Sequence, residues 1–270
     1  MLKNPIIDRP VGNIVSMAFV VAMMTYLLTP AAFAARLLET DDAGTLGKGV
    51  FQVEMGLEMS DHRQDQDNMV TKERTTSVST AFSYGIHDDI DIIMEFPYER
   101  MRAREDGITI HNEKGFSDLA LDAKWRFFEK ENLAFALKPG LSFPTGNDKK
   151  GLGTGRMTYG MVFITTMELE HLAFHLNAGY RRNENKGGER KDIWAANLAG
   201  EVSVAKPLKL VANVGVETNK DRDTSTAPAF FLGGLIYSVT DNIDIDFGYK
   251  RGLNKAESDN TYISGITIKF

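Results

Sequence analysis

The last eleven residues of the chain alternate between apolar and other side chains and end on an aromatic residue. Ile266, Ile268 and Phe270 fall on one side, and Thr267 and Lys269 fall on the other. This period of two is that of a β-strand with one apolar face. The chain is therefore predicted to finish inside a strand.

The same alternation recurs along most of the chain, although its phase is blurred in 157–167, by Val162 and Ile164, and is unclear in 229–239. With the chosen phases, the apolar faces carry no Asp, Glu, Lys or Arg. Such residues facing lipid would each cost about 2–4 kcal/mol at the bilayer midplane. The predicted strands are 50–59, 75–85, 90–101, 117–127, 133–143, 157–167, 172–181, 193–204, 208–217, 229–239, 243–250 and 261–270.

The connections between these strands alternate in length, as in a transmembrane barrel with short periplasmic turns and long outer loops. The aromatic residues then fall into two rims, as expected at the two membrane interfaces. We therefore predict an all-β, transmembrane antiparallel β-barrel of twelve strands over residues 50–270. The long polar connections are expected near 60–74, 102–116, 144–156, 182–192, 218–228 and 251–260.

The N-terminus predicts export. Lys3 and Arg9 precede an apolar stretch, 14–28, and a small-residue site, Ala32-Phe-Ala34. This is the pattern of a secretory signal peptide, predicted here as residues 1–34 and cleaved after Ala34. Residues 35–49 show no clean period and are predicted to be a periplasmic N-terminal segment.

The composition excludes several classes of protein. The chain has no cysteine, which removes disulfide frameworks and thiolate zinc sites. Its net charge of -6, with no basic cluster apparent in the sequence, argues against nucleic acid as a partner. The mean hydropathy of -0.24 excludes a multi-helix membrane protein. We expect no cofactor.

Three stretches carry a resemblance to a known family: Glu39-Thr-Asp-Asp-Ala-Gly to Glu54, Gly115-Phe-Ser-Asp to Phe127, and Leu141-Ser-Phe-Pro-Thr-Gly146. Together with the C-terminal Phe270, they resemble the outer-membrane family labelled "MetA-pathway of phenol degradation", whose members are described as transporters. This chain departs from the family pattern at Asn147-Asp148. The resemblance implies a Gram-negative outer-membrane location and insertion through the C-terminal strand. It also suggests hydrophobic or aromatic solutes, and it carries no catalytic residues.

Charged residues opposite the apolar faces are predicted to line the lumen, where they either form a solute pathway or pair to hold the wall together. We predict a cross-strand salt bridge between Asp122 and Lys138, and an acidic wall where Asp244 and Asp246 neighbour Glu54 and Glu58. The lumen-lining candidates are Glu54, Glu58, Asp91, Glu95, Asp118, Asp122, Lys124, Arg126, Lys138, His175, Arg181, Glu201, Lys209, Glu217, Asp244, Asp246 and Lys250.

An enzyme is the rival class, since a hydrolytic site needs a nucleophile, a base and an orienting group. His62 and His111 fall in predicted outer loops, His87 and His171 in turns, and only His175 faces the predicted lumen. No Ser is in phase with His175 on its strand. Acidic loop residues lack the spacing of a calcium loop, so no metal site is predicted.

The sequence therefore favours a non-enzymatic outer-membrane barrel for passive or selective passage of small molecules. Its partners are expected to be membrane lipid and lipopolysaccharide, the barrel-insertion machinery and the solute. Twelve strands lie between the filled and the open sizes of barrel, so the lumen is expected to be narrow, or to be plugged by residues 35–49 or by an inward-folded loop. The alternative is a structural or surface-interaction barrel with a closed lumen, and a hydrolase is less favoured.

Overall fold

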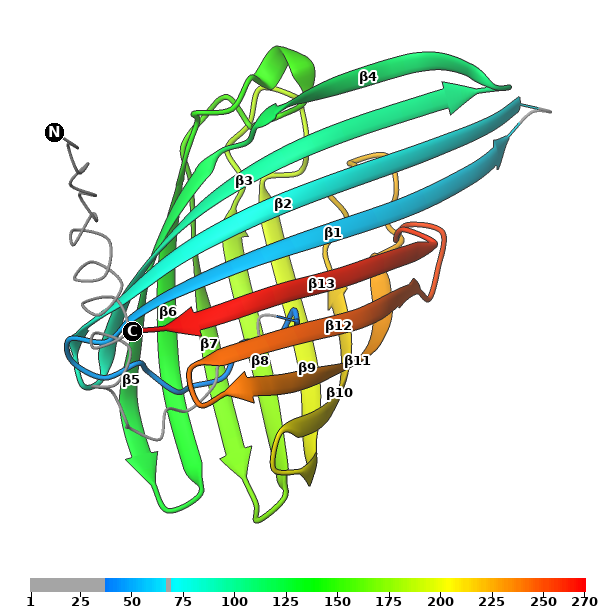
Figure 1. Cartoon of the computed structure of the whole chain (residues 1–270). Coiled ribbons are helices and arrows are strands. Elements are labelled where there is room, and N and C mark those ends of the chain that lie inside the picture. Colours follow the sequence, from blue (N-terminus) through cyan, green and yellow to red (C-terminus); the bar gives the residue numbers. More distant parts are fainter. Residues whose placement is uncertain (1–36, 67–68) are drawn as a thin grey trace, which may run out of the picture. The chain divides into compact units, whose positions relative to one another are not determined.

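The computed structural model describes residues 37–66 and 69–270, so the predicted signal peptide, 1–34, lies outside the described residues. The described chain forms an antiparallel sheet that closes into a barrel, because β1 pairs with β13 and β2, and β2 pairs with β3 (Figure 1). The strands are β1 (Phe51–Gln66), β2 (Met69–His87), β3 (Ile90–Glu105), β4 (Ile108–Phe116), β5 (Leu119–Lys130), β6 (Leu133–Phe143), β7 (Thr158–Glu168), β8 (Leu172–Arg182), β9 (Asp192–Ala205), β10 (Leu208–Glu217), β11 (Ala229–Thr240), β12 (Ile243–Gly252) and β13 (Asn260–Lys269).

β4 and β5 together occupy one position in the wall, which gives the predicted twelve-stranded barrel and confirms that fold. Both strands pair with β3, β5 at its start and β4 at its end. The interruption falls at Ser117 and Asp118, where the Ser117 N–H still donates to the Pro97 carbonyl at 2.9 Å. The Asp118 carboxylate accepts from the N–H groups of Gly146 and Thr154, which ties the connection after β6 to this break.

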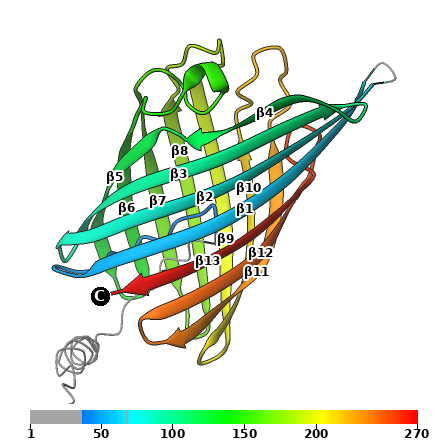
Figure 2. The same cartoon turned by 45° about the horizontal axis from the view of Figure 1, so that its top comes forward.

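Two predicted outer loops, 60–74 and 102–116, are wrong, because the structure continues β1–β2 and β3–β4 as strands through them. His62 and His111 accordingly lie on strands. β3 and β4 meet at Asp106 and Gly107, whose φ angles of 46° and 86° are those of a type I′ hairpin. These strand ends reach beyond the rest of the barrel (Figure 2), and we call them the strand extension: β1 from Asp61, β2 to Thr76, β3 from Glu99, and β4.

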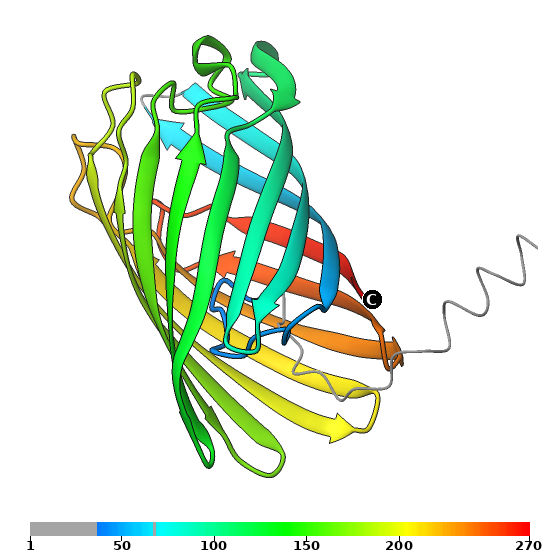
Figure 3. The same ribbon diagram turned by 90° about the vertical axis from the view of Figure 1, so that its left-hand side faces the viewer.

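The barrel has two different ends (Figure 3). Apart from the hairpins of the strand extension, the short turns lie at one, the turn end, together with Phe51 and Phe270, whose rings are 6.0 Å apart. The long connections lie at the other, the loop end, which contains the short 3-10 helix η1 (Asp148–Lys150). Aromatic pairs mark the loop-end rim, including Tyr180–Trp194 at 4.7 Å.

The outward face is apolar, as the alternation predicts. Large side chains such as Met161, Leu198 and Phe247 are each about half exposed there. No helix among the described residues is long and apolar enough to span a membrane.

Candidate functional site: the barrel lumen

Residues 37–46 lie among the inward-facing side chains of the barrel, and we call them the lumen segment. Leu37 and Leu38 are buried in a cluster with residues of β9, β10, β11 and β13, among them Leu232 and Ile263. Further along, Ala43 is fully buried against Ala136 and Ile164. The segment expected on the periplasmic side therefore packs against the inside of the wall.

Backbone groups of the lumen segment are held by polar side chains of the wall. The N–H of Glu39 donates to Asn213 Oδ1 at 2.9 Å, and Asn213 Nδ2 donates to Thr40 Oγ1 at 2.7 Å. The N–H of Leu46 donates to Asp91 at 3.0 Å. Because buried backbone groups need partners, these contacts let an irregular segment lie inside a barrel.

Asp41 is the most strongly bound side chain of the segment. Its carboxylate accepts from Lys124 Nζ and from Lys138 Nζ, both at 2.7 Å. Lys124 also donates to the carbonyls of Asp42 and Gly44, at 3.1 and 3.3 Å. Burial alone would raise the pKa of Asp41, but the two lysines hold it below its ordinary value. Asp41 therefore remains a carboxylate and joins two neighbouring strands through the segment.

The predicted salt bridge between Asp122 and Lys138 is wrong. A register shift between Arg126 and Phe128 places Asp122 opposite Gly140, and Lys138 pairs with Asp41 instead. A side chain at position 140 would collide with the Asp122 carboxylate. The error arose because the turn was taken to set Phe127 opposite Leu133, whereas Leu133 pairs with Lys130.

The predicted acidic wall lies on β1, β13 and β12. Glu54 and Asp244 are both in register with Thr267, one on each side of it. A positive charge lies beside this wall, since Lys250 Nζ is 2.9 Å from the Glu39 carboxylate and 3.9 Å from the Glu58 carboxylate. The buried acidic residues of this wall are Asp244 and Asp246.

His175 takes part in a chain of polar contacts under the lumen segment. Its Nδ1 lies 2.9 Å from Thr166 Oγ1, which also accepts from the Ala43 N–H at 2.8 Å. Its Nε2 lies 3.7 Å from Glu201, which pairs with Lys209 at 3.1 Å. The order hydroxyl, imidazole, carboxylate is that of a hydrolytic triad. However, Thr166 and His175 are buried and line neither cavity described below. This row of polar contacts is therefore better explained as an anchor for the segment.

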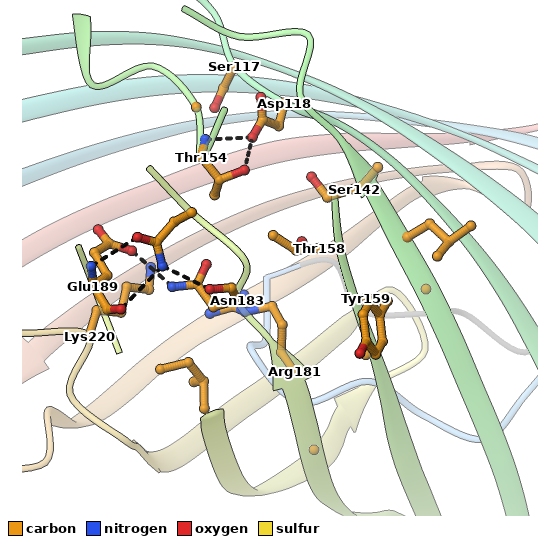
Figure 4. Close-up of a pocket in the computed structure, with 18 of the residues that line it drawn as sticks. Ser117, Asp118, Ser142, Thr154, Thr158, Tyr159, Arg181, Asn183, Glu189 and Lys220 are labelled. Atoms are coloured by element: carbon orange, nitrogen blue, oxygen red, sulfur yellow. Dashed lines mark hydrogen bonds between the residues drawn. The ribbon is translucent and has the colours of Figure 1, made fainter. Parts of the chain in front are cut away.

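A cavity of about 710 Å³ occupies the loop end of the lumen (Figure 4). It is bounded by β5–β9 and by the connections after β6, β8 and β10. Arg181 and Glu217, whose charged atoms are 4.0 Å apart, lie on its wall. Its charged lining residues are Glu99, Asp118, Asp122, Lys138, Asp148, Arg181, Lys186, Glu189, Glu217 and Lys220.

A second cavity of about 360 Å³ lies between the lumen segment and the β1–β3 wall. Glu54, Glu95 and Asp91 line it on the wall side. Asp122 and Lys138 line both cavities, so these two side chains lie at the border between them. Arg126 lies apart from both and pairs with Asp89 at the turn end, at 2.9 Å.

The residues that hold the segment were not among the predicted candidates; they are Asp41 on the segment and Asn213, Thr166 and Asn177 on the wall. With its amide oxygen facing the segment, Asn177 accepts from the Asp41 N–H at 2.7 Å. The available signal was the motif Glu39-Thr-Asp-Asp. Asp41 of this motif accepts a hydrogen bond from Lys124 of the second motif. Asp118 of the second motif in turn accepts one from the Gly146 N–H of the third motif.

No group of three or more His, Asp or Glu within 37–66 and 69–270 is arranged to hold a metal ion. The lumen side chains include ion pairs, amides and hydroxyls, together with the apolar residues against which the lumen segment packs. Such groups can orient or select a solute by charge.

The fold is that of known outer-membrane barrels. The chain is similar to the COG4313 outer membrane channel from Pseudomonas putida F1, with TM-score 0.66 and 16% identity over 85% of this chain and 98% of that one. It is also similar to the KdgM porin (TM-score 0.53, 10% identity, 81% and 99% covered) and the NanC porin (0.52, 11%, 82% and 100%). At these identities the likeness shows the fold.

No curated protein matches the chain. The family resemblance given by the three motifs is confirmed, because the sequence matches a family profile over residues 34–270. The chain belongs to the family described as "Putative MetA-pathway of phenol degradation".

Proposed function

We propose that this protein is an outer-membrane channel for small molecules in which the lumen segment forms the constriction. The observation that carries the proposal is the pair of cavities that share Asp122 and Lys138 as lining residues, one at the loop end and one beside the segment. A solute entering from the loop end reaches the segment without crossing the wall. Membership of the family, whose description names phenol degradation, favours small aromatic compounds as the solute class.

The placement in the outer membrane is supported by the apolar outward face between two aromatic rims. Barrels of this class put their short turns in the periplasm, so the turn end is periplasmic and the loop end faces outward. Phe270 would then be presented to the insertion machinery from the periplasm. Its N–H donates to the Phe51 carbonyl at 2.8 Å, which fixes the closing strand beside β1. Export by the predicted signal peptide, 1–34, is part of this proposal.

Liposome swelling tests the function. The mature protein, refolded and shown to be folded by a heat-dependent gel shift, is inserted into liposomes that are then diluted into phenol-sized neutral solutes or into disaccharides. We expect swelling with the small solutes and little with the disaccharides. Protein-dependent swelling with neither would support the second candidate, a closed-lumen structural barrel, which is favoured by the packing of Leu37, Leu38 and Ala43.

A further inference from the structure

On β2, β3 and β4 the strand extension separates its charges by face, whereas β1 adds Asp61, Arg63 and Asp65 to the outward face, with Arg63 paired to Asp65. On β3 the sequence Glu99-Arg-Met-Arg-Ala-Arg-Glu105 puts arginines at every second position. Because successive side chains on a strand point to opposite faces, these arginines share the outward face with Tyr98, while Glu99 lines the lumen cavity. We call the outward set the basic face: Lys72, Arg74, Arg100, Arg102, Arg104 and Lys114.

Strand pairing brings these cations directly opposite one another. Arg74 is in register with Arg102, Lys72 with Arg104, and Arg100 with Lys114. Directly opposite side chains on one face have Cβ atoms roughly 5 Å apart, and like charges there are destabilising. A run of such pairs on one surface needs an anion to offset it.

The protein supplies little of that negative charge. Arg74 pairs with Asp61 at 2.7 Å. For Lys72, Arg100, Arg104 and Lys114, no carboxylate of the described chain lies within 4.0 Å of the charged group. Each of these four side chains is exposed. The basic face is not apparent as a cluster in the sequence, because its cations lie on separate strands and only strand pairing brings them together.

On β8 and β9, a cation at a similar position relative to the aromatic rim does have acidic partners. There the aromatic pair Tyr180–Trp194 is followed on the loop-end side by Arg182. Arg182 is paired with Asp192 at 2.8 Å and with Glu184 at 2.9 Å. A cation above the aromatic rim is therefore neutralised on that wall and left unneutralised on the strand extension.

The height of the basic face identifies its ligand. Arg100 and Lys114 lie two residue pairs beyond Tyr98 and Phe116, whose rings are 5.3 Å apart and belong to the outward rim. Aromatic rims lie at the membrane interface, so the cations are level with the lipid headgroups. Arginine forks match phosphate oxygens in bidentate geometry. We propose that the basic face binds the phosphate groups of lipopolysaccharide in the outer leaflet.

The wild-type protein provides the first test, in detergent and with EDTA present so that divalent cations cannot bridge phosphates to acidic side chains. The probes are lipid A with both phosphates and the same lipid after phosphatase treatment. We expect the phosphorylated lipid to bind at least about tenfold more tightly, and added salt to remove the difference. Equal binding of the two lipids would overturn the proposal. Conduction is not involved, so a failed channel assay leaves this test intact.

A triple variant, R100Q/R102Q/R104Q, locates the site. We expect it to bind lipid A about a hundredfold more weakly, because each basic side chain near an anionic lipid surface contributes roughly a factor of five. The matched control, K149Q/K206Q/K255Q, removes the same charge from exposed lysines elsewhere and should bind as the wild type does. If both variants lost the same affinity for lipid A, net charge alone would explain the effect and the site would be refuted. A heat-dependent gel shift shows that each variant is folded.

Discussion

The two halves of the lumen differ although one wall encloses both. In the half that the lumen segment occupies, Leu37, Leu38 and Ala43 pack against inward-facing residues that are small or apolar, such as Ala136 and Leu232. In the loop-end half, charged and polar side chains face inward beside a few apolar ones such as Ile193, and they leave a cavity of about 710 Å³. In a barrel of this size, the side chains on the inner face therefore determine whether a segment of the chain packs into the lumen or leaves it open.

The difference is also one of hydrogen bonding. In the filled half, wall side chains accept and donate to the backbone of the lumen segment, as Asn213 does for Glu39 and Thr40. In the open half, polar side chains bind the connections instead, as Asp118 does for Thr154. Substituting wall side chains that bind the lumen segment should open the channel. Substituting polar side chains of the loop-end cavity should change only the selectivity for solutes.

Among single substitutions, Asp41→Asn should have the largest effect. It leaves Lys124 and Lys138 without their shared carboxylate, and breaking a buried ion pair costs about 3–5 kcal/mol. The segment should then leave the wall, and single-channel recordings should show a high-conductance state for most of the record. Asp122→Asn is the control, since it also removes a carboxylate beside Lys138 and should keep the segment bound. An Asp41→Asn channel that opens no more often than the control would contradict the anchoring role.

Gly248→Ala should come next. A Cβ at this position would lie 2.5 Å from the Leu37 side chain, and its nearest backbone neighbour is 3.5 Å away. The methyl group should therefore displace Leu37 without distorting β12, and openings should become more frequent. Gly233→Ala, where a Cβ meets nothing closer than 3.7 Å, should leave the recordings unchanged. Identical behaviour of the two variants would show that the Leu37 pocket does not hold the segment.

A smaller effect is expected from Asn213→Ala. The change removes the bonds to Glu39 and Thr40, and leaving such buried groups unsatisfied costs about 1–3 kcal/mol. The open fraction should rise above that of the wild type and stay below that of Asp41→Asn. A larger effect than at Asp41 would reverse the order of the two anchors.

The smallest effect on opening is expected from Arg181→Gln in the loop-end cavity. Arg181 lies 4.0 Å from Glu217 and has no contact with the lumen segment. Its removal should shift reversal potentials toward cation selectivity with the open fraction unchanged. A change in the open fraction would mean that the two halves of the lumen are coupled.

The alternating pattern predicted the barrel because its strands must separate a lipid face from a lumen face, and two ambiguities in it were informative. The phase was blurred in 157–167 and unclear in 229–239. These strands carry Ile164 and Leu232 on their inner faces, where the lumen segment packs. Apolar residues on both faces of a barrel strand thus mark where something fills the lumen.

Other features were beyond the alternation. The register of β5 with β6 depends on the shift beside Phe127, and a local bulge leaves no mark on a period-two pattern. Asp106-Gly107 is a strong hairpin signal that was overlooked, which turned the strand extension into a predicted loop. The partners of Asp41 are distant in sequence, so only the closed wall brings Lys124 and Lys138 to it.

The central claim is that residues 37–46 limit passage through an otherwise open barrel. It is tested most directly by planar-bilayer recordings of the mature protein beside a variant in which these residues are replaced by a glycine–serine linker of equal length. We predict small or rare current steps for the mature protein and steps several times larger for the variant, with both barrels folded by gel shift. Equal currents in the two proteins, or a folded variant that stays silent, would contradict the account.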